Sequence, residues 1–226
     1  MTTIPKAVGF DLDYTLYDTD GFLQSFFAAI APEVGRRLGQ DPARVAAVFG
    51  AALERLTLHH PRLLGAALED LGCRDAALEQ EMVERYRRHR PALATYPGVP
   101  AMLAGLRDQG IRLFLVTDGH SPVQQYKVEA LGLSPFFETL VFTGVLPATQ
   151  HKPSPVPFLM ATGQLGLRPD QCVYVGDDPH RDFEGPRRLG IRTVGVGTGP
   201  FAGLPAAAHQ RPDMRIGAVG ALRGVL

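Results

Sequence analysis

Apolar residues in this chain form short uninterrupted runs, separated by longer stretches in which they recur at helical spacing. The short runs are Ala7–Phe10, Ile111–Val116, Thr139–Phe142, Cys172–Val175 and Arg192–Val196. A short apolar run between polar residues is typical of a strand buried in a parallel sheet. Helical patterns separate the later runs, at Pro100–Gln109, Pro122–Leu131, Pro155–Leu165 and Arg181–Leu189. This alternation predicts an α/β fold with a Rossmann-like, doubly wound parallel sheet.

One long segment interrupts the alternation. It shows no convincing strand but has Leu- and Ala-rich helical patterns, at Gly21–Leu38, Pro42–Thr57, Pro61–Leu71 and Asp75–His89. We therefore predict a helical insert over residues 18–96, placed after the first strand of a Rossmann-like core made of residues 1–17 and 97–226. The tail predicts only a short strand near Met214–Ile216 and a final helix.

Composition limits the partners of the chain. Lys and Arg number 23, Asp and Glu also 23, and the formal net charge is zero. This balance favours neither nucleic acid nor an anionic membrane surface as partner. Two distant cysteines, Cys73 and Cys172, fit neither a disulfide framework nor a zinc site. The first residues lack the apolar core of a signal peptide, and no window approaches the length of a membrane span. We expect a cytoplasmic protein.

Polar residues follow four of the predicted strands, at positions where strand stability does not require them. They are Asp11 and Asp13 after the first run, Thr117, Asp118 and Gly119 after the second, Lys152 beyond the third, and Asp177, Asp178 and Asp182 beyond the fourth. Parallel strands end at one edge of the sheet, where ligands bind in open α/β folds. An Asp-x-Asp pair there suggests Mg²⁺, which prefers carboxylate oxygens. Carboxylates, a hydroxyl and an ammonium are the groups that phosphoryl transfer requires.

The order and spacing of these residues resemble the haloacid dehalogenase-like (HAD) superfamily. Its four motifs read here as Asp11-Leu12-Asp13-Tyr14-Thr15, Thr117, Lys152 and Gly176-Asp177-Asp178-x-x-x-Asp182. The resemblance extends from residue 6 to about residue 200. It implies a phosphatase with a helical cap inserted after the first motif.

The resemblance also implies roles for these residues. Asp11 is expected to attack phosphorus and form an aspartyl-phosphate. Asp13 is expected to protonate the leaving oxygen and then to deprotonate the attacking water. Thr117 and the loop at Gly119 are expected to donate hydrogen bonds to the phosphoryl oxygens. Lys152 is expected to neutralise charge between Asp11 and the phosphate.

The expected cofactor is Mg²⁺. The resemblance implies that Asp11, Asp177 and the backbone carbonyl of Asp13 hold the ion. Asp178 and Asp182 are expected either to bind it through water or to orient Lys152. The expected substrate is a small phosphorylated metabolite, and both a monomer and a homodimer remain open.

Two features leave alternatives open. Many members of the superfamily have Asn where this chain has Asp118, and an ionised carboxylate cannot donate to phosphate. Asp118 therefore either turns away or belongs to a loop that binds substrate differently. Three other functions also remain. They are a phosphosugar mutase, a dehalogenase, which the resemblance disfavours because dehalogenases lack the acid at Asp13, and a non-catalytic phosphate-binding module.

Overall fold

The computed structural model describes residues 4–58 and 60–226 and divides into two compact units. One unit contains the residues up to Thr19 together with Leu93–Leu226, and the other is Asp20–Ala92. The first unit holds the whole sheet and all the residues that the sequence assigns to a site.

The sheet has six parallel strands in the order β3-β2-β1-β4-β5-β6. Their bounds are β1 (Ala7–Phe10), β2 (Arg112–Thr117), β3 (Thr139–Phe142), β4 (Cys172–Gly176), β5 (Arg192–Val196) and β6 (Met214–Ile216). This order is that of a doubly wound Rossmann-like sheet, in which the chain reverses its direction of growth beside β1. The predicted α/β fold is confirmed, and the carboxyl ends of β1, β2 and β4 lie next to one another.

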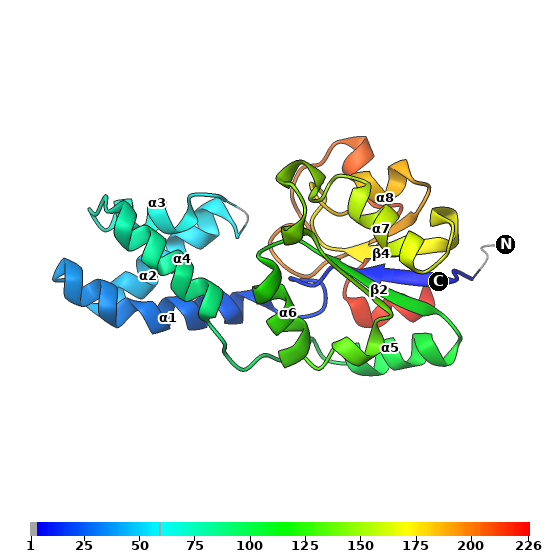
Figure 1. Cartoon of the computed structure of the whole chain (residues 1–226), viewed down its shortest axis with the longest axis horizontal. Helices are drawn as coiled ribbons and strands as arrows, with labels where there is room; N and C mark the ends of the chain where they lie inside the picture. The colour runs from blue at the N-terminus through cyan, green and yellow to red at the C-terminus, as the bar shows by residue number, and fades with distance from the viewer. Residues whose placement is uncertain (1–3, 59) are drawn as a thin grey trace. The chain divides into compact units, whose positions relative to one another are not determined.

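Helices cover both faces of this sheet. They are α5 (Val99–Asp108), α6 (Ser121–Ala130), α7 (Val156–Gln164) and α8 (Glu184–Arg188). Figure 1 shows α5 and α6 on one face and α7 and α8 on the other. Each of the four helices is followed by a glycine with positive φ, as the sequence predicts for a helix end, at Gly110, Gly132, Gly166 and Gly190.

The core under α7 explains the glycine in the first apolar run. Phe158 of α7 packs with Phe114 of β2 and Tyr174 of β4, and all three are buried. A Cβ atom on Gly9 of β1 would lie 2.1 Å from the Phe114 ring. Only glycine leaves room for that ring beside β1, so this position serves packing rather than chain flexibility.

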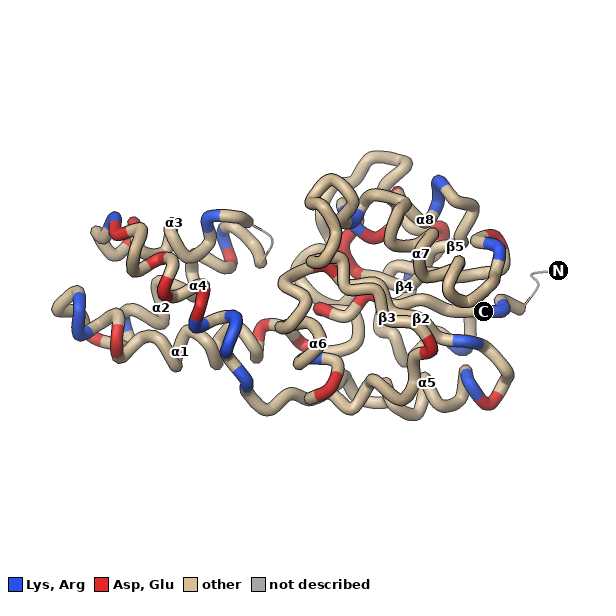
Figure 2. The backbone as a smooth tube through the Cα atoms, in the orientation of Figure 1, with Lys and Arg blue, Asp and Glu red and all other residues tan. Residues whose placement is uncertain are grey.

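The described residues of the second unit form helices and the loops between them. Most of it consists of α1 (Thr19–Leu38), which begins at the end of the first unit, α2 (Pro42–Leu56), α3 (Leu63–Asp70) and α4 (Ala76–Arg88). The side chains of Asp41 and Asp75 cap α2 and α4 by accepting backbone N–H bonds in the first turn. Figure 2 shows acidic and basic positions interspersed along these helices.

Several elements differ from their predicted bounds or form. Helix α8 begins at Glu184 rather than Arg181, because Asp182 is bonded into the preceding loop. The predicted final helix is a short 3₁₀ helix, Val219–Gly224. Helix α3 begins at Leu63, two residues after the predicted start at Pro61.

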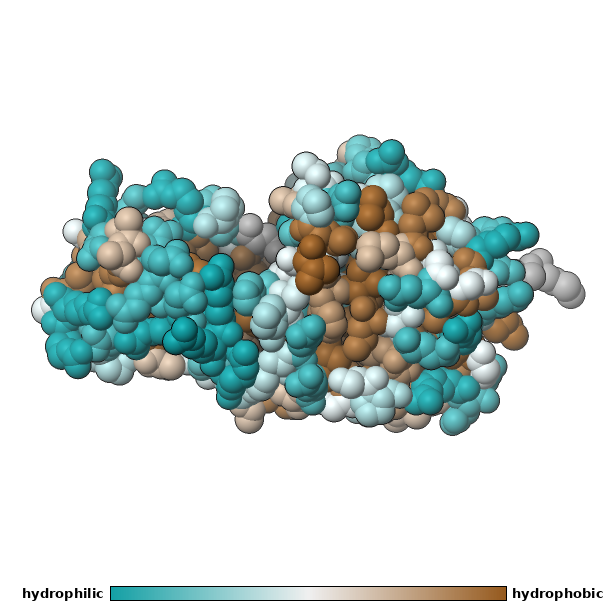
Figure 3. Space-filling model, viewed as in Figure 1, coloured by the Kyte–Doolittle hydropathy of each residue, from teal (hydrophilic) through white to brown (hydrophobic). Residues whose placement is uncertain are grey.

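The surface of the sheet unit carries some apolar residues. Figure 3 shows apolar patches on the face of this unit that it presents. Val145, in the short 3₁₀ helix after β3, and Leu159 and Met160 of α7 are exposed apolar residues. Within the described part of the chain, no helix has both the length and the apolar character needed to span a bilayer.

Candidate active site

The structure brings the predicted site residues together at the carboxyl edge of the sheet. Asp11 directly follows β1, Thr117 ends β2 and Asp177 directly follows β4. Lys152 enters from the loop between β3 and α7. The side chains of Asp11, Asp13, Thr117, Asp118, Lys152, Asp177, Asp178 and Asp182 are all buried. Figure 2 shows acidic positions gathered where the central strands end.

Lys152 joins the first and fourth motifs. Its Nζ donates to Oδ1 of Asp11 at 2.6 Å, to Oδ1 of Asp182 at 2.7 Å and to the Tyr174 hydroxyl at 3.5 Å. Burial alone would lower the pKa of Lys152, but the two carboxylates raise it well above its usual value. The charged form of Lys152 is therefore favoured by the two carboxylates it contacts, one of which is Asp11.

Asp182 is fixed from two sides. While its Oδ1 binds Lys152, its Oδ2 accepts the backbone N–H of Asp177 at 3.1 Å and of Asp178 at 2.9 Å. This arrangement folds the loop after β4 back onto its own carboxylate. It corresponds to the predicted alternative in which Asp182 orients Lys152.

The donors that fit a divalent cation are present at the same point. Asp11, Asp177 and Asp182 each offer a carboxylate oxygen within 4.8 Å of the others. Oδ2 of Asp177 is buried and has no hydrogen-bond partner among the described residues. Such a group is costly unless it has a ligand. Hard oxygen donors of this kind are those that Mg²⁺ prefers.

The pKa values of these carboxyls show how much negative charge the site holds. Burial raises the pKa of Asp11 to about 8, with Asp182 and Asp13 adding to the effect and Lys152 offsetting only part of it. Burial, Asp182 and Asp11 raise the pKa of Asp177 well above its usual value. A bound cation would favour the charged form of both groups.

Asp13 lies in a separate hydrogen-bond network. Its Oδ1 accepts from the Tyr17 hydroxyl at 2.5 Å, from Thr19 at 3.1 Å and from Lys127 Nζ at 2.6 Å. Its Oδ2 accepts from the Gln124 amide at 2.7 Å. Burial would raise the pKa of Asp13, but Lys127 and these hydrogen bonds bring it below its usual value.

Asp118 connects three loops. Its Oδ2 accepts from Nε and Nη2 of Arg181 at 3.0 and 2.5 Å, and its Oδ1 accepts from the Thr143 hydroxyl at 2.6 Å. Oδ1 also accepts the backbone N–H of Lys152 at 3.3 Å. Burial would raise the pKa of Asp118, but Lys152 and Arg181 lower it. The carboxylate therefore carries a charge that the protein itself neutralises.

The remaining predicted residues shape the edges of the site. Thr117 Oγ1 accepts from the Gln124 amide at 2.7 Å, and Gly119 adopts a φ of +120°. Oδ1 of Asp178 accepts the backbone N–H of His180 at 2.8 Å. Burial, followed by Asp182, raises the pKa of Asp178.

Comparisons with known proteins identify the family of the chain. The family model described as haloacid dehalogenase-like hydrolase matches residues 8–196. The chain belongs to this family. Among curated relatives, a phosphoserine phosphatase of Thermus thermophilus is 34% identical over 158 residues, 69% of this chain and 60% of the relative. The match thus spans less than two thirds of that relative.

Two further relatives match over most of their length. An N-acetylmuramic acid 6-phosphate phosphatase of Pseudomonas aeruginosa is 32% identical over 92% of this chain and 89% of the relative. A crystal structure of a 2-haloacid dehalogenase from Pseudomonas syringae has a TM-score of 0.64 at 26% identity and covers 97% of each chain. The protein is thus a hydrolase, on a scaffold that phosphatases and dehalogenases share.

In this hydrolase the residue after Asp13 has an uncommon backbone conformation. Tyr14 has a φ of +56°, which L-residues with side chains rarely adopt. The Thr198 hydroxyl donates to the Tyr14 carbonyl at 2.6 Å, and the Phe201 ring meets the Tyr14 ring edge-on at 5.6 Å. A Cβ atom on Gly199 would lie 2.5 Å from that of Tyr14. The turn at Asp13 is therefore held by the loop after β5.

Sequence reasoning missed seven residues that bond to the predicted ones, namely Tyr17, Thr19, Gln124, Lys127, Thr143, Tyr174 and Arg181. One signal was available for Lys127. It lies four residues after Val123 and four before Leu131, within the apolar stripe of α6. A lysine in such a stripe indicates a buried partner.

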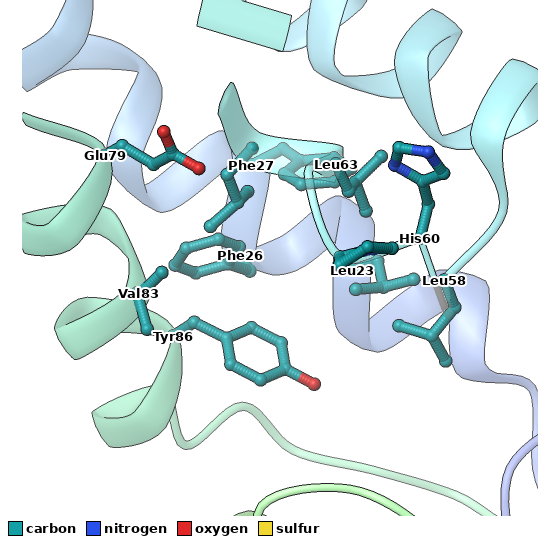
Figure 4. A pocket seen from close by; sticks show the side chains of 11 residues that line it. Leu23, Phe26, Phe27, Leu58, His60, Leu63, Glu79, Val83 and Tyr86 are labelled. Carbon is teal, nitrogen blue, oxygen red and sulfur yellow. The ribbon is translucent and has the colours of Figure 1, made fainter. Parts of the chain in front are cut away.

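The Asp20–Ala92 unit of the hydrolase contains a cavity of about 200 Å³. Leu23, Phe26 and Phe27 of α1 line one side of it, and Val83 and Tyr86 of α4 line another. Figure 4 shows Glu79 and His60 at opposite ends of this mostly apolar space. This segment contains no sequence motif for substrate choice, and the cavity is a feature that could bind a small molecule.

Proposed function

We propose that this hydrolase is a Mg²⁺-dependent phosphatase that hydrolyses a small phosphomonoester through an aspartyl-phosphate on Asp11. The observation that most directly supports this proposal is the position of Asp11. Its buried carboxylate lies between Lys152 and the unpaired oxygen of Asp177. Stability alone gives no reason to bury so many carboxylates together. The named phosphatase relatives support the same reaction class.

The proposed chemistry has two steps. In the first, an oxygen of Asp11 attacks phosphorus, the bond from phosphorus to the ester oxygen breaks, and Asp13 gives that oxygen a proton. In the second, Asp13 takes a proton from water, which attacks phosphorus and releases inorganic phosphate and free Asp11. Lys152 offsets the negative charge that gathers on the phosphoryl oxygens, and Thr117 with the loop at Gly119 donates hydrogen bonds to them.

The proposed cofactor fits the donors described above. Asp11, Asp177 and the backbone carbonyl of Asp13 would hold Mg²⁺, with Asp178 and Asp182 around them. When bound, the ion supplies positive charge next to the attacking carboxylate and the phosphate. Asp182 binds Lys152 and two backbone N–H groups, so we assign it to positioning Lys152 rather than to direct coordination.

We propose that the helical segment, residues 18–96, acts as a cap that excludes water and selects the substrate. The apolar cavity between α1 and α4 supports this role, because it suits an organic group of modest size. A small cytoplasmic metabolite fits this proposal better than a phosphoprotein.

The alternatives make different predictions. A dehalogenase has no use for an acid at Asp13 or for the acidic fourth motif, and both are present. A phosphosugar mutase would pass the phosphoryl group to a sugar hydroxyl and would release little phosphate without an acceptor. A non-catalytic module would release none.

The test is phosphate release from a panel of small phosphomonoesters, with Mg²⁺ and with EDTA. Asp11→Asn should abolish turnover and keep the wild-type melting temperature within a few degrees, because the replacement is isosteric. Asp108→Asn, the same change at an exposed position on α5, serves as the matched control. Wild-type activity in Asp11→Asn, or undiminished release in EDTA, would contradict the proposal.

A further inference from the structure

Lys127 is a buried lysine outside the four motifs. The sequence has three lysines against twenty arginines, and Lys6 is exposed while Lys127 and Lys152 are buried. The two buried ones each pair with one aspartate of the first motif, Lys152 with Asp11 and Lys127 with Asp13. Lys127 is 1% exposed, so its ammonium has given up nearly all of its water. A charge is buried at such cost only for a specific partner.

Helix α6 directs two side chains at the same carboxylate. Gln124 and Lys127 are three residues apart and therefore lie on one face of the helix. Lys127 Nζ binds Oδ1 of Asp13 at 2.6 Å, and the Gln124 amide binds Oδ2 at 2.7 Å. The Gln124 amide also donates to Thr117 Oγ1 at 2.7 Å. Both oxygens of Asp13 are thus fixed relative to the end of β2.

The other contacts of Asp13 are neutral hydroxyls close to it in sequence, on Tyr17 and Thr19. They restrain the carboxylate locally but do not connect it to the rest of the sheet. Lys127 supplies the charged contact from a distant segment, and its Nζ also lies 5.7 Å from the centroid of the Tyr17 ring. The direction in which the Asp13 carboxylate points therefore depends on Lys127 together with Gln124, and Lys127 supplies the only charged contact among those given above.

We infer that Lys127 is a positioning residue of the phosphatase reaction, which holds the Asp13 carboxylate in line with the ester oxygen that receives its proton. The inference rests on the proposed function. Proton transfer requires the donor within hydrogen-bond reach of that oxygen, and a displacement of about 1 Å lowers rates by about 10²-fold. Lys127 acts through Asp13 and does not itself touch the substrate.

The leaving group provides a test that a general loss of structure would not mimic. An alkoxide must be protonated as it leaves, whereas p-nitrophenolate leaves without a proton. Lys127→Met should therefore lower kcat/KM about 10²-fold for the fastest alkyl phosphate of the panel, beginning with glycerol 3-phosphate, and less than about 10-fold for p-nitrophenyl phosphate. Lys6→Met, the same change at the exposed lysine, should alter neither value.

An equal loss for both esters, or no loss for either, would overturn the role of Lys127 and leave the phosphatase proposal standing. Absence of phosphate release from both esters by the wild type would overturn the proposed function instead. If Lys127→Met does not fold, the pair Asp13→Asn and Asp13→Asn/Lys127→Met replaces it, since neither variant leaves a charged Asp13 unpaired. The two should have equal kcat/KM for the alkyl ester, and a further loss in the double variant would contradict action through Asp13.

Discussion

The contact between Asp118 and Arg181 makes a quantitative prediction about stability. In Asp118→Ala the guanidinium of Arg181 loses both of its hydrogen bonds to Oδ2, and the Thr143 hydroxyl and the Lys152 N–H lose their acceptor. Removing one partner of a buried ion pair costs about 3–5 kcal/mol. The Arg181 side chain is 26% exposed and can regain some water, so we expect about 3 kcal/mol, the lower end of that range.

That loss should be visible in thermal unfolding. For a chain of this length each kcal/mol lowers the melting temperature by about 2–4 °C, so Asp118→Ala should melt about 6–12 °C below the wild type. Asp118→Asn keeps the shape and one acceptor oxygen but has an NH2 donor in place of the other oxygen and no charge. Its melting temperature should therefore lie between those of the wild type and Asp118→Ala.

The matched control is a pair of the same chemistry on the surface. Arg168 binds Asp170 through two hydrogen bonds of 3.0 and 2.7 Å, with side chains that are 75% and 55% exposed. Solvent screens that pair, so Asp170→Ala should melt within about 2 °C of the wild type. If Asp118→Ala shifts the melting temperature no more than Asp170→Ala, Asp118 does not hold these loops together.

Three further predictions concern the metal, pH and packing. Mg²⁺ should raise the melting temperature of the wild type but not of Asp177→Asn, and an equal rise in both would contradict the assignment of Asp177. The pKa of Asp11, about 8 in the fold, lies above its unfolded value of 3.8, so the folded state holds the extra proton between these values. The metal-free protein should therefore lose stability as pH rises from about 4 to about 8, as measured by urea unfolding in EDTA, and Asp11→Asn should flatten the profile. Gly9→Ala should cost about 1–3 kcal/mol by urea unfolding, since its Cβ would overlap the Phe114 ring, and a stability equal to wild type would show that the ring can move.

The strands were predictable because most of their residues are apolar and most of those in β1, β2, β4 and β5 are buried. Burial on both faces leaves only one pattern for such a segment, and β1, β3 and β5 have the predicted bounds. The start of α8 was not predictable from local sequence. Residues 181–189 have a helical pattern, but Asp182 bonds to Lys152 and to two backbone N–H groups of its own loop. Those tertiary bonds keep the first residues of the pattern out of the helix.

The site residues also fall into two groups, those that local sequence predicts and those that it does not. Asp11, Asp177 and Lys152 could be predicted because each lies at or beyond the end of an apolar run, where the fold brings segments together. Tyr174 and Arg181 could not, because their partners lie in segments distant in sequence. Asp118 belongs to both groups. Its position after β2 could be predicted from the sequence, but the neutralisation of its charge by Arg181 could not.

The contacts that Thr198 and Phe201 make with Tyr14 affect how the protein can be shortened. Thr198 and Phe201, which hold the turn after Asp13, lie beyond residue 196, where the family match ends. A fragment trimmed to the matched residues would keep β1 to β5 yet lose the contacts that support a left-handed residue beside the proposed acid–base group. The end of the family match and the end of the segment that supports this turn therefore differ here, and expression designs should keep the loop after β5.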